Sequence, residues 1–282
     1  MKVMSEEQVA RWRQDGFLSP FPLLDAAELR TCRNGLQRFE DWLGGPVNGV
    51  TDLKYRTMPH LILPWAAKLV RDPRILDAVE DLLGPDLLIY TSTFFIKEPH
   101  SPTIAAWHQD STYYGLEPKE AINVWIALTE ANEAAGCMEA LSFRGRPRQL
   151  RHASRVVEHS VNRASQMIVE PLDEGDPVAM PLAAGSFSMH HGLCPHRSGP
   201  NGADHRRIGL GLNYIPTCVR PAGSIKPAAM LVRGTDRYGH FEHVEPAQIE
   251  LSPEAVAIHD RAVALYRDCY LEEEARHALL SA

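Results

Sequence analysis

The residues of this chain best suited to chemistry are a histidine and an aspartate two positions apart. His108 and Asp110 lie in the run WHQD at residues 107–110. On an extended backbone, side chains two positions apart point to the same side, so this imidazole and this carboxylate could bind one ion. A second histidine from a distant strand would complete two nitrogens and one oxygen on one face of an octahedron. Three positions would stay open for iron(II) chemistry.

A histidine-rich segment further along the chain offers candidates for the third ligand. His190 and His191 are adjacent on an expected strand, so only one of them can face the interior. His196 comes just after that strand, beside Ser198 and Gly199, where a tight turn could aim it. The spacing leaves all three histidines open as candidates.

The elements that must position these residues change from helix to strand and back along the chain. Capping residues and apolar spacings of three to four predict helices over 5–16, 25–44 and 72–84, and a last one over 252–270 on the outside of the sheet. Runs rich in β-branched and aromatic residues, separated by turn residues, predict a series of strands. These are 87–96, 121–128, 136–141, 166–170, 178–182, 186–190 and 207–215. The pattern predicts one mainly β domain over 1–282, a sandwich or jelly roll with flanking helices.

Composition narrows the classes of function. The chain has 282 residues, 44% of them hydrophobic, and a formal net charge of -7. Nucleic-acid binders and polybasic membrane proteins need positive fields, so we expect neither partner and instead a small-molecule substrate. The five cysteines are scattered, which indicates neither a disulfide framework nor a zinc ribbon. We see no signal peptide or membrane-spanning run and expect a soluble, cytoplasmic protein, whose oligomeric state the sequence does not indicate.

Taken together, the motifs resemble the phytanoyl-CoA dioxygenase family. The resemblance runs from about residue 10 to about residue 220. It depends on WHQD at 107–110, AINVWIAL at 121–128, GCM at 136–138, HRSGPN at 196–201, Arg207, and the segments 82–86 and 95–97.

The resemblance implies a double-stranded β-helix enzyme that uses iron(II) and 2-oxoglutarate to activate O2. The family's iron ligands match His108, Asp110 and His196, and a planar guanidinium suits the distal carboxylate of 2-oxoglutarate. The cosubstrate residues that match are Arg207 for that carboxylate, Ser198 close by, Trp125 as an aromatic wall and Lys97 as a polar contact near the mouth of the pocket. His190 and His191 are expected to line the pocket or to hydrogen-bond behind the ligands.

The substrate is less defined by the sequence. Where many relatives have a Pro-Gly-Ser-His turn, this chain has Leu-Ser-Phe-Arg at 141–144, so the loop there should differ. Arg144 and Arg146 belong to a local arginine cluster that could receive an anionic substrate, or could be an ordinary solvated loop. Tyr113 or Tyr114 could reach the cavity. We expect a small amino acid derivative, organophosphonate or natural-product intermediate rather than phytanoyl-CoA.

Three functions compete at this point. The first is a hydroxylase that oxidises an unactivated C–H bond. The second is a halogenase, which Asp110 disfavours because halogenating relatives have a small residue at the metal carboxylate. The third is a non-catalytic binding jelly roll, disfavoured because all three metal ligands and Arg207 are present.

Overall fold

The computed structural model describes residues 1–282 except 50–51, 113, 155–158, 161–165, 173–174 and 282. The helices are α1 (Glu6–Asp15), α2 (Ala26–Leu43), α3 (Pro64–Val70), α4 (Pro73–Leu83) and α5 (Pro253–Ser281), with short 3-10 turns η1 (Leu53–Arg56), η2 (Pro59–Leu61) and η3 (Asp110–Thr112). No helix within these described residues is both long and apolar enough to cross a membrane.

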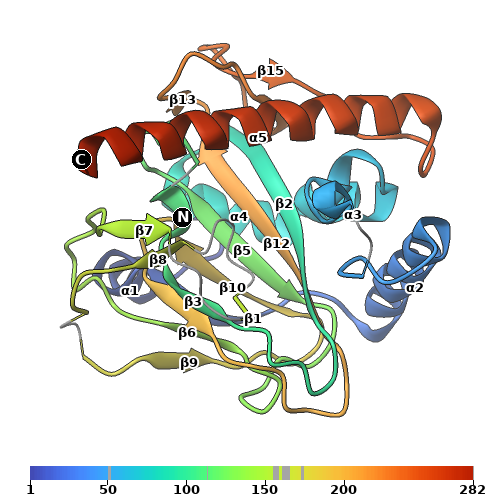
Figure 1. Ribbon diagram of the computed structural model, residues 1–282, viewed down its shortest axis with the longest axis horizontal. Coiled ribbons are helices and arrows are strands. Elements are labelled where there is room, and N and C mark those ends of the chain that lie inside the picture. Colours follow the sequence, from blue (N-terminus) through green and yellow to red (C-terminus); the bar gives the residue numbers. More distant parts are fainter. Residues whose placement is uncertain (50–51, 113, 155–158, 161–165, 173–174, 282) are drawn as a thin grey trace.

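Two antiparallel sheets form most of the fold (Figure 1). The larger has the order β1 (Phe17–Pro22), β10 (Ser186–His191), β5 (Ile122–Ala127), β12 (Arg207–Pro216), β2 (Leu87–Lys97), β14 (Ala228–Arg233), β15 (Glu242–His243), with only β14 and β15 paired in parallel. The smaller has the order β3 (Ala105–His108), β11 (His196–Ser198), β6 (Met138–Ala140), β9 (Val178–Met180). Two-stranded pairs are β13 (Arg220–Pro221) with β4 (Leu116–Glu117), and β7 (His152–Ser154) with β8 (Gln166–Ile168). The predicted mainly β jelly roll with flanking helices is confirmed.

Helices α1, α2 and α4 begin and end at the capping residues and glycines from which the sequence predicted them. Ser5 and Asp25 each form a capping box at the start of α1 and α2, and Asp72 caps α4 ahead of Pro73. Glycines in the left-handed region end α1 and α2. The sequence did not indicate α3, the strands β1, β7, β11 and β14, or the two-residue strands. The C-terminal helix is longer than expected, and it packs across one end of the large sheet (Figure 1).

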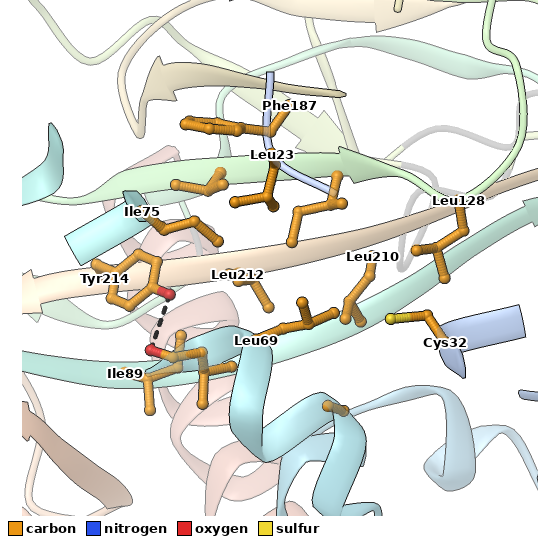
Figure 2. Packing of buried hydrophobic residues seen from close by; sticks show 14 of the residues in the cluster. Leu23, Cys32, Leu69, Ile75, Ile89, Leu128, Phe187, Leu210, Leu212 and Tyr214 are labelled. Carbon is orange, nitrogen blue, oxygen red and sulfur yellow. Dashed lines mark hydrogen bonds between the residues drawn. The ribbon is translucent and has the colours of Figure 1, made fainter. Parts of the chain in front are cut away.

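The two faces of the large sheet have different surroundings, as the side chains of β12 show. Leu210, Leu212 and Tyr214 point to one face, where they join the main hydrophobic core with residues of α2, α3 and α4 (Figure 2). The Tyr214 hydroxyl donates to the carbonyl of Val70 in α3 at 3.0 Å. The alternate residues of β12 face the smaller sheet, because side chains alternate along a strand. One face therefore builds the core and the other lines a cavity.

Candidate active site

The two sheets bring the three predicted metal ligands together. His108 at the end of β3 pairs in register with His196 of β11. Asp110 Oδ1 lies 3.5 Å from His108 Nε2, and Asp110 Oδ2 lies 3.7 Å from His196 Nε2. One ligand atom from each residue can be chosen so that all three lie within 4.8 Å of one another. This arrangement has the donor set of an iron(II) site with open positions.

The backbone that carries His108 and Asp110 differs from the expected one. Strand β3 ends at His108, and Asp110 begins the 3-10 turn η3, so the prediction of one extended segment is wrong at Asp110. The cause is Gln109, whose side-chain amide donates to the carbonyls of Arg148 at 2.8 Å and Leu193 at 2.6 Å. These bonds hold the chain in a turn, and the turn directs Asp110 toward the histidines.

Hydrogen bonds determine the tautomer in which His108 and His196 would bind a metal. The Nδ1 of His108 lies 2.8 Å from the carbonyl of Ala106, and the Nδ1 of His196 lies 3.0 Å from the carbonyl of Cys194. A carbonyl only accepts, so each Nδ1 carries the hydrogen and each Nε2 keeps a lone pair for a cation. The tautomers thus fit a divalent metal.

Electrostatics keeps Asp110 and His196 in their ligating forms. Burial opposes ionisation of Asp110, but the neighbouring imidazoles of His196, His108 and His190 outweigh it and hold the pKa of Asp110 well below the usual range. Burial and the neighbouring His108 hold the pKa of His196 well below its usual value. An ionised carboxylate and a neutral imidazole are the forms that bind metals.

A buried cation lies in the same cavity. Arg207 is 5% exposed, and its guanidinium lies 5.4 Å from the ring centre of Trp125. It donates through Nη1 to the carbonyl of Gly136, and among the described residues no carboxylate lies within ion-pair distance of it. Burial lowers the pKa of Arg207 to about 10, which leaves it charged at neutral pH. Such a group calls for an anionic ligand.

Lys97 lies behind this pocket and not at its mouth. It is 2% exposed and does not line the cavity. Its Nζ lies 2.8 Å from Ser198 Oγ and also donates to the carbonyl of Gly199. Ser198, which does line the cavity, is thus held in place from behind by a buried amine.

The cavity between the sheets has a volume of about 190 Å3. The metal ligands, Arg207, Ser198 and Trp125 all line it. Tyr266 and Tyr270 also reach it from α5, so that helix closes the site as well as covering the sheet. Further lining residues that the sequence did not single out are Arg56, Thr91, Thr93, Asn123 and Asn213.

Of the predicted substrate contacts, some line the cavity and others do not. Tyr114 lines the cavity, whereas Tyr113 falls outside the described residues. Arg144 and Arg146 are exposed and are not among the cavity-lining residues, because their turn packs against the end of α1, where Gly145 bonds to the carbonyl of Gln14. The solvated-loop alternative describes these two arginines better.

The two adjacent histidines of β10 point to opposite sides of the strand, and the expectation that both line the pocket or support the ligands is wrong for His191. His190 lines the cavity, and its Nε2 lies 2.9 Å from Asp110 Oδ2. His191 points away from it, with its ring 3.6 Å from a Glu120 oxygen and near the ring of Trp12. Asn123, inside the hydrophobic strand β5, could have been noticed as the one polar residue of that run.

This chain is similar to proteins whose family or activity is known. Residues 12–209 match the family model for phytanoyl-CoA dioxygenase. A probable alpha-ketoglutarate-dependent hypophosphite dioxygenase of Stutzerimonas stutzeri is 27% identical over 202 residues, 69% of this chain and 65% of that protein. An ectoine dioxygenase of Bordetella parapertussis is 28% identical over 146 residues, 47% of each chain. The chain thus covers less than two thirds of the length of either relative.

Solved structures extend the similarity over nearly the whole chain. The apo form of ThoJ, a non-heme monooxygenase, is 31% identical with a TM-score of 0.83, covering 95% of this chain and 99% of that one. CytC3 with Fe(II) and alpha-ketoglutarate has a TM-score of 0.64 at 22% identity, covering 89% and 98%. The second likeness concerns the fold alone.

Proposed function

Because this chain belongs to the phytanoyl-CoA dioxygenase family of iron(II)- and 2-oxoglutarate-dependent oxygenases, we propose that it hydroxylates an unactivated C–H bond of a small anionic metabolite. One atom of O2 enters the substrate as the hydroxyl group. The other enters succinate, formed from 2-oxoglutarate with loss of CO2. The atoms balance with no further reductant.

The chain's own residues would hold the cofactors as follows. His108 and His196 offer Nε2 atoms and Asp110 a carboxylate oxygen, and bound iron(II) with 2-oxoglutarate supplies the activation of O2. Arg207 holds the distal carboxylate of the keto acid beside Trp125. The observation that carries the proposal is this buried Arg207, which has no acidic partner among the described residues and lines the same cavity as the three ligands.

The substrate lies at the end of the cavity near α5. Tyr114, Tyr266 and Tyr270 form an aromatic wall there that excludes water and confines a small molecule. Arg56 lines the cavity from η1, on a different element from Arg207, so a substrate anion can reach it while Arg207 holds the keto acid. In this proposal Arg56 takes the anionic group of the substrate, the role that the sequence suggested for Arg144 and Arg146. Amino acid derivatives, organophosphonates and natural-product intermediates fit this description.

Succinate formation tests the proposal. Purified protein with iron(II), ascorbate and O2 should convert 2-oxoglutarate to succinate, faster when a small anionic substrate is present. Asp110→Ala and His196→Ala should abolish the conversion, whereas Arg144→Ala should retain it. Turnover that persists in both metal-ligand variants contradicts the proposal, and chlorinated product from the unmodified protein contradicts hydroxylation.

A further inference from the structure

A row of polar side chains crosses the inner face of the large sheet and ends at Asp110. His190 of β10 pairs in register with Asn123 of β5, and Asn123 with Asn213 of β12. All three are buried, at 3%, 8% and 2% exposure, and all three line the cavity. Three adjacent strands thus place one imidazole and two amides in a line beside the metal carboxylate.

Hydrogen bonds run along this row in one direction. The Nδ2 of Asn213 donates to Asn123 Oδ1 at 2.7 Å, and the Nδ2 of Asn123 donates to Asp110 Oδ2 at 2.5 Å. An ionised carboxylate can only accept, so Asn123 must present its amide nitrogen to Asp110 and its oxygen to Asn213. Asn213 must therefore present its own nitrogen. The direction follows from the chemistry, and each amide has a single workable orientation.

The same carboxylate oxygen also receives His190. His190 Nε2 lies 2.9 Å from Asp110 Oδ2, and it must be the donor in this pair. A carboxylate oxygen has about two lone-pair positions, and here Oδ2 has both occupied, by Asn123 and by His190. Oδ1 lies 3.5 Å from His108 Nε2 and accepts no amide or imidazole hydrogen bond from the part of the chain that the structure describes. The two oxygens of Asp110 are thus unequal before any metal arrives.

We propose that His190 and the Asn213–Asn123 amide pair are positioning residues that make Asp110 a one-oxygen metal ligand. This inference rests on the proposed function, because its benefit concerns the cosubstrate. A chelating keto acid needs two coordination positions and O2 a third, which is the number left open by two histidines and one oxygen. A carboxylate bound through both oxygens would take one of these positions. Holding Oδ2 away from the metal keeps the position open.

The test compares variants of the row in protein loaded with nickel(II), which binds without turnover. His190→Leu removes one donor to Oδ2. Asn213→Asp is isosteric, but the new carboxylate can only accept a hydrogen bond. The Asn123 amide must then rotate so that its nitrogen faces residue 213 and its oxygen faces Asp110. We expect each variant to weaken 2-oxoglutarate binding about 10-fold, the low end of the losses in metal affinity or activity that follow mutation of residues behind metal ligands. Nickel(II) affinity should fall less than 2-oxoglutarate affinity. Calorimetry measures both affinities, and circular dichroism measures the melting temperature.

Two controls separate positioning from simple structural support. His190→Gln keeps an N–H donor of similar reach and should restore 2-oxoglutarate affinity. His191→Leu changes the adjacent histidine, which points away from the cavity, and should leave 2-oxoglutarate affinity unchanged. Unchanged 2-oxoglutarate affinity in His190→Leu and Asn213→Asp overturns the inference. So does an equal fall of nickel(II) and 2-oxoglutarate affinities that tracks the melting temperature.

Crystal structures of the nickel-loaded proteins give a reading that does not depend on 2-oxoglutarate. Asp110 should bind nickel through one oxygen in the unmodified protein and through both in Asn213→Asp. Two-oxygen binding in the unmodified protein refutes the positioning role even if the enzyme is active. Failure of the unmodified nickel protein to bind 2-oxoglutarate contradicts the proposed function, while the coordination of Asp110 still decides this inference.

Discussion

The imidazoles of His108 and His196 face each other across β3 and β11, with ring centres 4.1 Å apart. Both Nε2 atoms lie near the Asp110 carboxylate. The lone pairs of these nitrogens and of the carboxylate oxygens repel one another, and a bound cation would replace this repulsion with attraction. Metal binding should therefore stabilise the folded protein. At 100 times its dissociation constant, a ligand contributes about 2.7 kcal/mol, or a rise in melting temperature of about 5 °C at this size. Calorimetric scans with and without nickel(II) measure this shift.

His108→Ala should lose most of that rise, and His191→Ala should keep it, because His191 is not a ligand. An equal rise in both variants would mean that the metal binds elsewhere.

Arg207 should contribute to cosubstrate binding at a cost to stability. Arg207→Met removes a buried cation that has no acidic partner among the described residues, so the melting temperature of the free protein should stay the same or rise. Arg207→Lys keeps the charge but loses the planar fork. We expect the KM for 2-oxoglutarate to rise about 10-fold in Arg207→Lys and further in Arg207→Met, since a tenfold change corresponds to about one charge-assisted hydrogen bond. Succinate assays over a range of 2-oxoglutarate concentrations measure this. A lower melting temperature in Arg207→Met would show that the cation supports the fold.

Much of this fold could be predicted because local signals and tertiary packing agree. The capping boxes at Ser5 and Asp25 begin helices where the sequence places them. Strand β12 was predicted from its composition. In the structure its residues alternate between two faces: Leu210 and Leu212 face the core, while Gly211 and Asn213 face the cavity.

The parts that escaped prediction depend on contacts between distant segments. Arg56 ends a short 3-10 turn, and Tyr266 lies on α5, yet both reach one cavity. No local sequence pattern predicts that these two residues lie at the same cavity. The turn at Asp110 was missed for a similar reason, since Gln109 is held by carbonyls of residues far along the chain.

Lys97 should give the protein a specific pH dependence of stability. Burial and the nearby charge of Arg207 lower the pKa of Lys97 to about 6, against 10.5 for an ordinary lysine. Between these values the unfolded chain binds one more proton at this site than the folded protein, so the free energy of unfolding rises with pH. Below pH 6 both states are protonated, and the cost of burying the ammonium is fully present.

Lys97→Met should remove this contribution. The variant should therefore gain stability over the original protein most at pH 6 and below, and the gain should shrink steadily toward pH 10. Urea unfolding at several pH values measures the difference between the two proteins. A difference that does not change with pH would mean that the lysine is charged throughout, held by Ser198 and Gly199.

Gly209 should be required for the orientation of Trp125. A Cβ atom added at Gly209 would lie 1.9 Å from Cζ2 of Trp125, so the indole must move from its place beside Arg207. Gly209→Ala should lower the melting temperature and raise the KM for 2-oxoglutarate. Gly45→Ala is the matched control, because a Cβ there meets nothing within 4 Å.

A double variant tests whether the clash is the cause. Trp125→Phe shortens the side chain, so Gly209→Ala should cost less stability in that background than in the original protein. Additive losses would point to the backbone of β12 instead of the indole.

Arg56 should determine which substrates are accepted without affecting the cosubstrate. It lines the cavity from η1, on a different element from Arg207, and we propose that the two cations bind different anions. A screen of small carboxylates, amino acids and phosphonates identifies compounds that accelerate succinate formation. For such a compound, Arg56→Met should raise the substrate KM about 10-fold or more, the scale of one lost charge-assisted hydrogen bond, and leave the KM for 2-oxoglutarate unchanged. Arg144→Met and Arg146→Met should change neither constant, since both residues are exposed outside the cavity. If the arginines at 144 and 146 control the substrate KM and Arg56 does not, the substrate enters from the loop side and its anion lies away from α5.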